Sequence, residues 1–314
     1  MRHAVSRRAL LTTTALLGAE AVLAQDAAPA PPRFGTAAPR RTMPTICVHS
    51  GNLAKVPYFQ LGDIAAQLGF DGVDLTVMIG GHVDPRVTNV DLIRAFEAIR
   101  GSGLEVPMIA TNITGPQDQT AFPVLYLTGR SQVPLFRLGY WPYGTNPIQQ
   151  RLAQARQDLI QLLPLAQRST ITGMVHNRAG GFIGQALWDT QQVISTIDPR
   201  WMGYCYDPAE ATAEGGLGGW ESGLRLALPR LKALVLQDFY WAKVGDTWTM
   251  TKCPLGEGMV DWEKFFTLVA GSGFTGPISI YQQYVVQDSL GAMTRDLEFA
   301  RRQVQRAWTA QSTR

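Results

Sequence analysis

The sequence predicts an α/β fold with one domain, a (β/α)₈ TIM barrel. Short apolar runs alternate along the chain with amphipathic helical stretches, and eight such runs occur. Strands that alternate with helices form parallel sheets, and eight of these units close into a barrel more readily than they form an open sheet. The runs end in polar or aromatic residues, namely His49, Asp74, Asn112, Tyr140, His176, Asp207, Asp238 and Gln283. Catalytic groups of this fold lie on the loops after the strands, so this pattern predicts a small-molecule site there.

The pattern of the N-terminal residues predicts a targeting segment that precedes the folded domain. Arg7 and Arg8 stand directly before the apolar residues 9–24, which end in small residues that signal peptidase accepts. We therefore expect residues 1–24 to be a twin-arginine signal peptide, cleaved near Gln25, and the protein to be periplasmic or secreted. A membrane anchor is the alternative, but the apolar stretch is shorter than the roughly 20 residues that span a bilayer. We expect no stable membrane insertion after cleavage.

Residues 25–42 are predicted to form a disordered linker. They are rich in Ala, Pro and Arg and contain almost no large apolar side chains that a folded core could bury. The remaining residues, 43–310, contain no second linker and are expected to form one barrel around one core.

Charge and cysteine content narrow the classes of partner. The formal net charge is +3, and the five lysines are dispersed with no basic run in the body of the chain, so nucleic acid is not an expected partner. The three cysteines, Cys47, Cys205 and Cys253, are odd in number and show no metal-binding spacing. We therefore expect neither a disulfide framework nor a cysteine metal site.

The first half of the barrel follows from apolar spacing. The helices at residues 57–68 and 91–102 carry apolar residues at helical intervals, and Gly69 ends the first of them. Residues 111–133 lack clear periodicity and are long for a plain connection, so we predict a lid or site-forming loop. The four expected strands are residues 45–49, 72–77, 106–110 and 135–140.

The second half repeats the pattern. A long helix at residues 147–166 precedes the fifth strand, and a helix at residues 288–310 closes the chain. The glycine run at residues 215–219 does not have the spacing of a nucleotide-binding loop, so we predict a flexible segment and no nucleotide cofactor. The four expected strands are residues 171–176, 201–207, 231–237 and 276–281.

Five motifs now identify a family resemblance. They are GFDGVDL at residues 69–75, the His176-Asn177 pair, QDFYW at residues 237–241, PLGEGMVD at residues 254–261 and GPISI at residues 276–280. Together they resemble the xylose isomerase-like TIM barrels, the sugar phosphate isomerase/epimerase group, from about residue 43 to about residue 305. The chain looks like an exported member of that group.

The resemblance implies a divalent metal site. Family members hold the metal with carboxylates after the fifth, sixth and eighth strands and with a histidine on the seventh, and the metal polarises a hydroxy-carbonyl unit during proton transfer. In this chain His176 stands where Glu is common, and Asp207 matches the usual Asp. The other positions depart further: Val235 and Gln237 replace His and Lys, Tyr281 and Gln283 replace His or Glu, and Glu210 replaces another His.

These departures weaken the implied metal site. A hard divalent ion needs several anionic oxygens or imidazoles, and an amide oxygen adds no net charge. Only His176 and Asp207 are good ligands, with Gln283 and Glu210 as weaker ones. The sequence therefore leaves a bound metal, Mn²⁺ or similar, an open question.

Two of the expected catalytic residues follow neighbouring strands. Because a histidine side chain ordinarily titrates near neutral pH, His176 is predicted to act as a general base, an acid or a metal ligand. The alternative is a structural histidine bonded to a loop. Asp207 lies at the tip of an apolar strand and is predicted to bind metal or accept a proton, with an N-terminal cap of the next turn as the alternative.

A second group surrounds the long loop after the seventh strand. Asp238 and Lys243 are predicted to be catalytic, and Trp241 and Glu257 to hold a sugar, because an aromatic ring beside carboxylates and an ammonium suits a polyol. A surface salt bridge is the alternative for Lys243. The remaining expected substrate contacts are His49, Asp74, Arg137, Trp141, Asn177 and Gln283.

These observations predict an exported enzyme of the isomerase/epimerase type. It would abstract a proton next to a carbonyl of an unphosphorylated sugar, keto-sugar or glycoside, and a lyase is a close variant because elimination needs the same step. The alternative is a carbohydrate-binding barrel that has lost the metal site and its chemistry. Barrels of this group often pair through their outer helices, which leaves a homodimer open.

Overall fold

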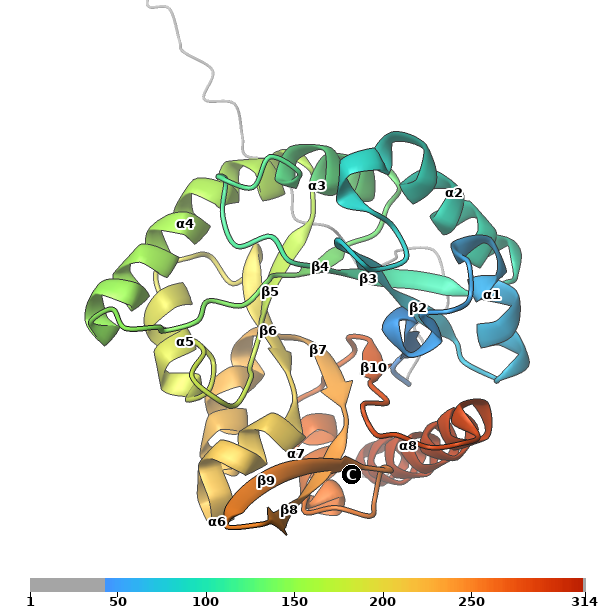
Figure 1. Cartoon of the computed structure of the whole chain (residues 1–314), viewed down its shortest axis with the longest axis vertical. Helices are drawn as coiled ribbons and strands as arrows, with labels where there is room; N and C mark the ends of the chain where they lie inside the picture. Colours follow the sequence, from blue (N-terminus) through green and yellow to red (C-terminus); the bar gives the residue numbers. More distant parts are fainter. Residues whose placement is uncertain (1–42, 313–314) are drawn as a thin grey trace, which may run out of the picture.

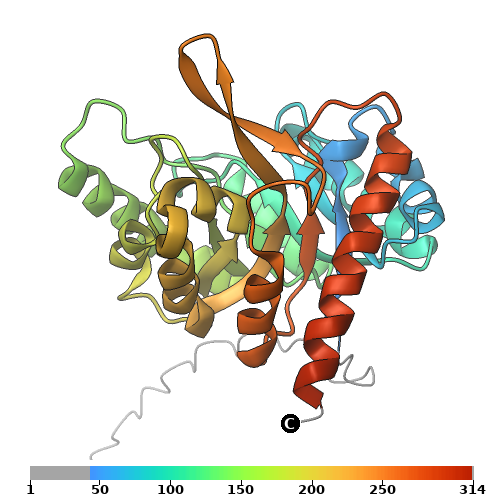
Figure 2. The same ribbon diagram turned by 90° about the horizontal axis from the view of Figure 1, so that it is seen from below.

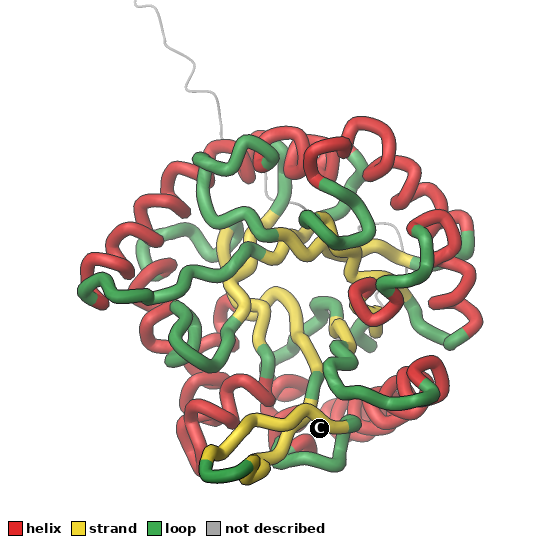
Figure 3. The backbone as a smooth tube through the Cα atoms, viewed as in Figure 1, coloured by secondary structure: helices red, strands yellow, loops and turns green. Residues whose placement is uncertain are grey.

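The computed structural model describes residues 43–312, so the predicted signal peptide and linker lie outside the described residues. Eight parallel strands close into a barrel in the order β1, β10, β7, β6, β5, β4, β3, β2 (Figure 1). Helices surround this ring of strands (Figure 3). The predicted (β/α)₈ barrel is therefore confirmed.

The eight expected strands are all present. They are β1 (Ile46–His49), β2 (Gly72–Val77), β3 (Glu105–Thr111), β4 (Leu135–Arg137), β5 (Thr172–His176), β6 (Met202–Tyr206), β7 (Leu231–Leu236) and β10 (Ile278–Ile280). The α-helices are α1 (Tyr58–Gln67), α2 (Thr88–Gly101), α3 (Ala121–Arg130), α4 (Ile148–Arg168), α5 (Leu187–Ile194), α6 (Pro208–Ala227), α7 (Trp262–Gly271) and α8 (Ser289–Ser312). Three short 3₁₀ helices are η1 (Ser50–Leu53), η2 (Pro85–Val87) and η3 (Leu228–Arg230).

Two loop predictions are wrong. Residues 121–130 form α3, which buries apolar residues at helical spacing against the barrel, so residues 111–133 are not an irregular lid throughout. The glycine run lies within α6, where Gly216 has φ 52° and ψ −137° and kinks the helix. Packing of the flanking turns against the barrel overrides the low helix propensity of these glycines.

The segment after β7 is also more ordered than predicted. β8 (Asp238–Val244) and β9 (Thr247–Cys253) pair as an antiparallel hairpin. Figure 2 shows this hairpin projecting beyond one end of the barrel. The hairpin replaces the long loop that the sequence suggested.

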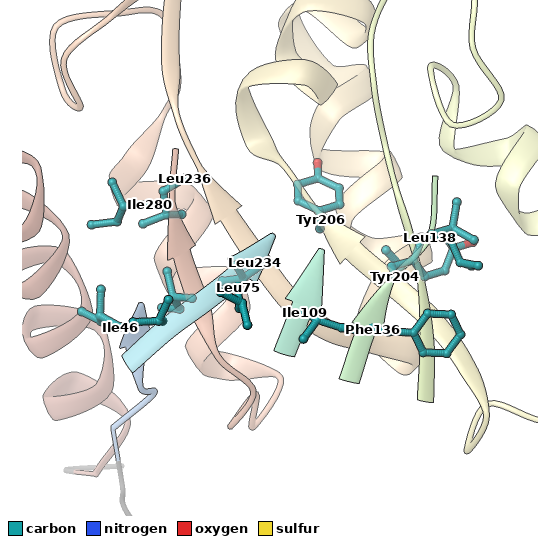
Figure 4. Packing of buried hydrophobic residues seen from close by; sticks show 14 of the residues in the cluster. Ile46, Leu75, Ile109, Phe136, Leu138, Tyr204, Tyr206, Leu234, Leu236 and Ile280 are labelled. Carbon is teal, nitrogen blue, oxygen red and sulfur yellow. The ribbon is translucent and has the colours of Figure 1, made fainter. Parts of the chain in front are cut away.

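Alternation along the strands divides the core into two parts. Outward-facing strand residues such as Leu75, Phe136 and Leu234 belong to the large apolar cluster, part of which is drawn in Figure 4. Successive side chains of a strand point to opposite faces, so the intervening residues point into the barrel. The apolar cluster inside consists of Met108, Leu135, Met174, Cys205, Ala233, Val235 and Tyr281.

The next inward positions along the same strands are polar. Two residues beyond Leu135 lies Arg137, and two beyond Met174 lies His176. The same step of two leads from Cys205 to Asp207 and from Val235 to Gln237. The barrel interior thus changes from apolar to polar toward the carboxyl ends of the strands, which is the end where this fold carries its sites.

None of the helices within residues 43–312 is long and apolar enough to cross a membrane.

Candidate active site

A cavity of about 700 Å³ opens at the carboxyl ends of the strands. This volume is typical of small-molecule sites, which range over about 300–1,000 Å³. The lining residues are His49, Met78, Asn112, Arg137, Tyr140, His176, Asn177, Arg178, Ala179, Gly180, Glu210, Ala213, Glu214, Gln237, Trp241, Met250, Lys252, Tyr281 and Gln283. Six residues predicted from the sequence lie among them: His49, Arg137, His176, Asn177, Trp241 and Gln283.

His49 and Asp74 form a histidine–carboxylate pair at the cavity wall. His49 Nδ1 lies 3.0 Å from Asp74 Oδ2, and the imidazole stacks on the Tyr281 ring at a centroid distance of 3.8 Å. Burial would raise the pKa of Asp74, but the neighbouring His49 and its hydrogen bond lower it, so Asp74 is ionised and accepts the Nδ1 proton. In the neutral form of the His49 imidazole, the lone pair is then on Nε2. Gly51 keeps the space beside that atom open, because a Cβ there would lie 2.9 Å from Nε2.

Asp74 itself lies behind the cavity wall. Only 1% of the residue is exposed, and Ser279 and Tyr281 also donate hydrogen bonds to Oδ2, at 2.9 and 3.3 Å. The predicted substrate contact is therefore indirect, because Asp74 reaches the cavity only through His49 and Tyr281.

A chain of hydrogen bonds leads from Arg137 to His176. Arg137 Nη1 donates to Tyr140 Oη at 2.9 Å, and Tyr140 Oη lies 2.7 Å from His176 Nδ1. Since Tyr140 oxygen accepts from the guanidinium, its own proton is available to His176 Nδ1. This assigns the remaining imidazole proton to Nε2, which lies 3.5 Å from Asp207 Oδ2.

These contacts change the role expected for His176. Burial and the nearby positive charge of Arg137 lower the pKa of His176 well below its ordinary value, so the imidazole is neutral. With Nδ1 accepting from Tyr140 and Nε2 bearing a proton toward Asp207, neither nitrogen offers a lone pair to the cavity. The arrangement favours a positioning role for His176 over that of a general base.

Asp207 is both the predicted site residue and the cap that was its alternative. The residue is fully buried, and Oδ1 accepts from the backbone N–H groups of Ala209 and Glu210 at 2.9 and 3.1 Å, which caps α6. Oδ2 accepts from the side-chain amide of Gln237. Burial raises the pKa of Asp207 to about 6. Asp207 does not line the cavity and acts behind His176 and Gln237.

Glu210, Lys252 and Gln237 form a charged cluster in the cavity wall. Lys252 Nζ donates to Glu210 Oε1 at 2.6 Å, and Gln237 Nε2 donates to the same oxygen at 3.0 Å. Glu210 Oε2 accepts from the backbone N–H of Ala179 at 2.9 Å. The cation of this cluster comes from β9, so the hairpin completes the site.

The donor set does not fit a divalent metal. Within residues 43–312, no group of three or more His, Cys, Asp or Glu side chains could hold an ion. The carboxylates of Asp207 and Glu210 instead accept from the Gln237 amide, and the Lys252 ammonium already neutralises Glu210. The side-chain NH₂ group of Gln237 points at the carboxylates of Asp207 and Glu210. The amide oxygen of Gln237 therefore points away from these carboxylates and cannot bind a metal ion between them. We therefore derive no chemical step through a metal.

Asp238 is placed away from the cavity, and its predicted catalytic role is corrected here. Its side chain is fully buried and accepts five hydrogen bonds, all from the loop that follows the hairpin or from the adjoining chain. The donors are the backbone N–H groups of Phe239, Gly256, Gly258 and Val260 and the indole N–H of Trp262. A carboxylate with all its lone pairs occupied cannot take a substrate proton.

The PLGEGMVD motif supplies three of the backbone N–H groups that donate to the Asp238 carboxylate. A Cβ at Gly258 would lie 2.2 Å from Asp238 Oδ1, so only glycine allows the loop to approach the carboxylate. Glu257 in the same motif is exposed and does not line the cavity. The motif therefore anchors the hairpin to the barrel, and the structure does not bring Glu257 to the sugar subsite.

Two further predicted residues are not brought to the cavity. Trp141 is 2% exposed and packs in the apolar core, so it is not a substrate contact in this structure. Lys243 is exposed near the tip of the hairpin, opposite Trp248, and does not line the cavity.

Lys252 lines the cavity and is a candidate site residue that the sequence analysis missed. Trp241 pairs with Met250 across the hairpin, and residues two apart on a strand share a face, so Met250 and Lys252 turn toward the cavity together. A signal was present, because Gly245-Asp246 separates two runs of aromatic and β-branched residues, as in a tight hairpin.

Comparison with known proteins agrees with this architecture. A model of the xylose isomerase-like TIM barrel family matches residues 129–303. Among curated protein sequences none matches this chain. Solved structures do match, and three of them share the fold of this chain at low sequence identity.

A xylose isomerase-like TIM barrel protein from Mycobacterium smegmatis, in complex with magnesium, is 14% identical with a TM-score of 0.67, and the match covers 84% of this chain and 98% of that chain. The 3-keto-D-glucoside 4-epimerase of E. coli is 13% identical with a TM-score of 0.66, over 82% and 99% of the two chains. D-allulose 3-epimerase from Methylomonas sp., in complex with D-allulose, is 13% identical with a TM-score of 0.63, over 83% and 97%.

Proposed function

This chain belongs to the xylose isomerase-like TIM barrel family, and on that premise we propose that it is a carbohydrate isomerase or epimerase. Its chemical step would be abstraction of a proton next to a carbonyl of an unphosphorylated sugar, keto-sugar or glycoside. Structural neighbours include epimerases of a 3-keto-D-glucoside and of D-allulose, which supports this class of substrate. We also propose that the protein is exported through its twin-arginine signal.

The observation that carries the proposal is the His49–Asp74 pair beside an open cavity. A buried carboxylate holds Nδ1–H at 3.0 Å and leaves the Nε2 lone pair for a substrate, which is the arrangement of a general base and its orienting group. His49 would take the proton from the carbon next to the carbonyl, and the electron pair would move to the carbonyl oxygen. Asp74 would stabilise the imidazolium that forms.

A positive charge of the protein can stabilise the negative oxygen of the enolate. The Lys252 ammonium lines the cavity, and only one of its three N–H groups is needed for Glu210, so the others can donate to an oxyanion. Return of the proton from His49 to the former carbonyl carbon gives an isomer. An epimer forms when a second group of the cavity wall, such as the Lys252 ammonium, delivers a proton to the opposite face of the same carbon and regains one from solvent, while His49 releases its proton to solvent. Loss of a group from the next carbon gives the lyase variant.

Solvent exchange tests the common step without knowledge of the product. Incubation of the full chain with a panel of keto-sugars and 3-ketoglucosides in D₂O is expected to place deuterium on the carbon next to the carbonyl, as followed by ¹H NMR. Exchange at a rate no higher than without protein, combined with sugar binding by calorimetry, would favour the carbohydrate-binding alternative.

Removal of divalent metals is expected to leave that exchange rate unchanged. The reason is that the amide of Gln237 and the ammonium of Lys252 already occupy the carboxylate oxygens to which an ion would bind. The measurement compares protein dialysed against EDTA with protein supplied with Mn²⁺, alongside elemental analysis. Loss of exchange in EDTA and recovery with Mn²⁺ would contradict the assignment of Lys252 as the cation of the site.

A further inference from the structure

Arg137 is a buried cation, and no carboxylate of residues 43–312 accepts a hydrogen bond from it or forms an ion pair with it. The residue is 6% exposed and points into the barrel from the end of β4. Neighbouring ionisable groups keep its pKa above the ordinary value despite burial, so the guanidinium is charged. Among the described residues its one hydrogen bond goes to Tyr140, and Nε is buried with no partner. A guanidinium has five N–H donors, so most of this fork is unused.

Asp74 is a nearby carboxylate whose charge stabilises that of Arg137, but no hydrogen bond or ion pair joins the two side chains within residues 43–312. Asp74 Oδ2 accepts from His49, Ser279 and Tyr281. Asp74 Oδ1 and Arg137 Nε are both buried without a hydrogen-bond partner among the described residues. A buried charge whose N–H donors are mostly unused is costly, because those donors have lost their hydrogen bonds to water. An anionic group of a ligand in the cavity would supply the acceptors that these donors lack.

Arg178 adds a second guanidinium to the same wall. Its Cζ lies 4.6 Å from the centroid of the Tyr140 ring, while that of Arg137 lies 5.4 Å from the same centroid. Arg178 is exposed and, among the described residues, makes no ion pair with a carboxylate. The Lys252 charge, in contrast, is already balanced by Glu210. The unbalanced positive charge of the cavity therefore lies around Tyr140.

We propose that Arg137, with Arg178 beside it, binds a carboxylate of the substrate, so that the enzyme acts on a sugar acid. The inference rests on the proposed function and names its substrate class. A planar carboxylate matches the guanidinium fork and can accept two N–H bonds. A phosphate dianion is less suited, because Glu214 also lines the cavity and would repel its second charge.

Equilibrium binding tests the proposal with matched probes. Calorimetry would compare D-glucuronate with D-glucuronamide, which has the same shape without the charge, and with D-glucose 6-phosphate. We expect D-glucuronate to bind about 10- to 100-fold more tightly than the amide, the range expected for hydrogen bonds to a charged group. Equal affinity for acid and amide, or tighter binding of the phosphate, would overturn the proposal.

Variants assign the preference to Arg137. Arg137→Gln is expected to bring the acid-to-amide affinity ratio close to one, Arg137→Lys to retain part of it, and Arg94→Gln, on the outer surface of α2, to leave it unchanged. A ratio that survives in Arg137→Gln would overturn the assignment. If that variant does not fold, a crystal structure of the full chain with D-glucuronate decides, because the carboxylate must lie within about 3.2 Å of the guanidinium.

The binding test is independent of turnover. A carboxylate preference without deuterium exchange would remove the proposed enzyme function and leave the anion subsite in place. Deuterium exchange with neutral keto-sugars but no preference for the carboxylate would support the proposed enzyme function and remove the anion subsite.

Discussion

Replacing His49 with Gln is expected to reduce the turnover number by about 10²- to 10⁴-fold, the contribution of a general base. Glutamine keeps a similar length and can still donate to Asp74, but it has no lone pair basic enough to accept a carbon-bound proton. The Michaelis constant should change little, because the cavity keeps its shape. Steady-state kinetics and the rate of deuterium exchange measure the effect.

Two companion variants separate a basic role from a structural one. Asp74→Asn keeps the size of the side chain but removes the negative charge that stabilises the imidazolium and fixes its tautomer, so a loss in turnover comparable to that of His49→Gln is expected. Lys55→Gln, on an exposed residue nearby, should have no effect. Turnover of His49→Gln close to that of the parent protein would contradict the assignment, and the first candidate to examine would then be Glu210.

Replacing Asp238 with Ala is expected to lower the free energy of unfolding by about 3–5 kcal/mol, which is a large share of the 5–15 kcal/mol typical of a domain. The reason is that five N–H donors lose their acceptor together in a fully buried place. Urea denaturation followed by circular dichroism measures the change.

Two other aspartates of the same region serve as graded controls. Asp261 caps α7 through one bond to the Lys264 N–H, so Asp261→Ala should cost about 1 kcal/mol. Asp246 is exposed in the hairpin turn, and Asp246→Asn should change stability by less than about 0.5 kcal/mol. If Asp238→Ala were as stable as Asp246→Asn, the carboxylate would not be an anchor. If Asp238→Ala does not fold, Trp262→Phe removes a single donor and should show a smaller loss.

The candidate site was predicted unevenly from the sequence. Residues at the ends of strands, such as His49, Arg137 and His176, line the cavity because the strand period carries them there. Asp207 and Asp238 also end strands, but their carboxylates are consumed by backbone and side-chain donors. Spacing alone cannot distinguish a carboxylate that faces a cavity from one that holds a loop, because the donors come from distant positions in the chain.

The sequence by itself determined the barrel, its strands and the end at which polar groups gather. These follow from local periodicity, which records the faces that each strand and helix must bury. Only the tertiary structure decided which of those groups meet. The hairpin brings Lys252 to Glu210, and pairing of β1 with β2 places His49 Nδ1 3.0 Å from Asp74 Oδ2. Closure of the barrel by β10 brings Ser279 to the same carboxylate. These contacts depend on how the elements pair in space, which no local pattern encodes.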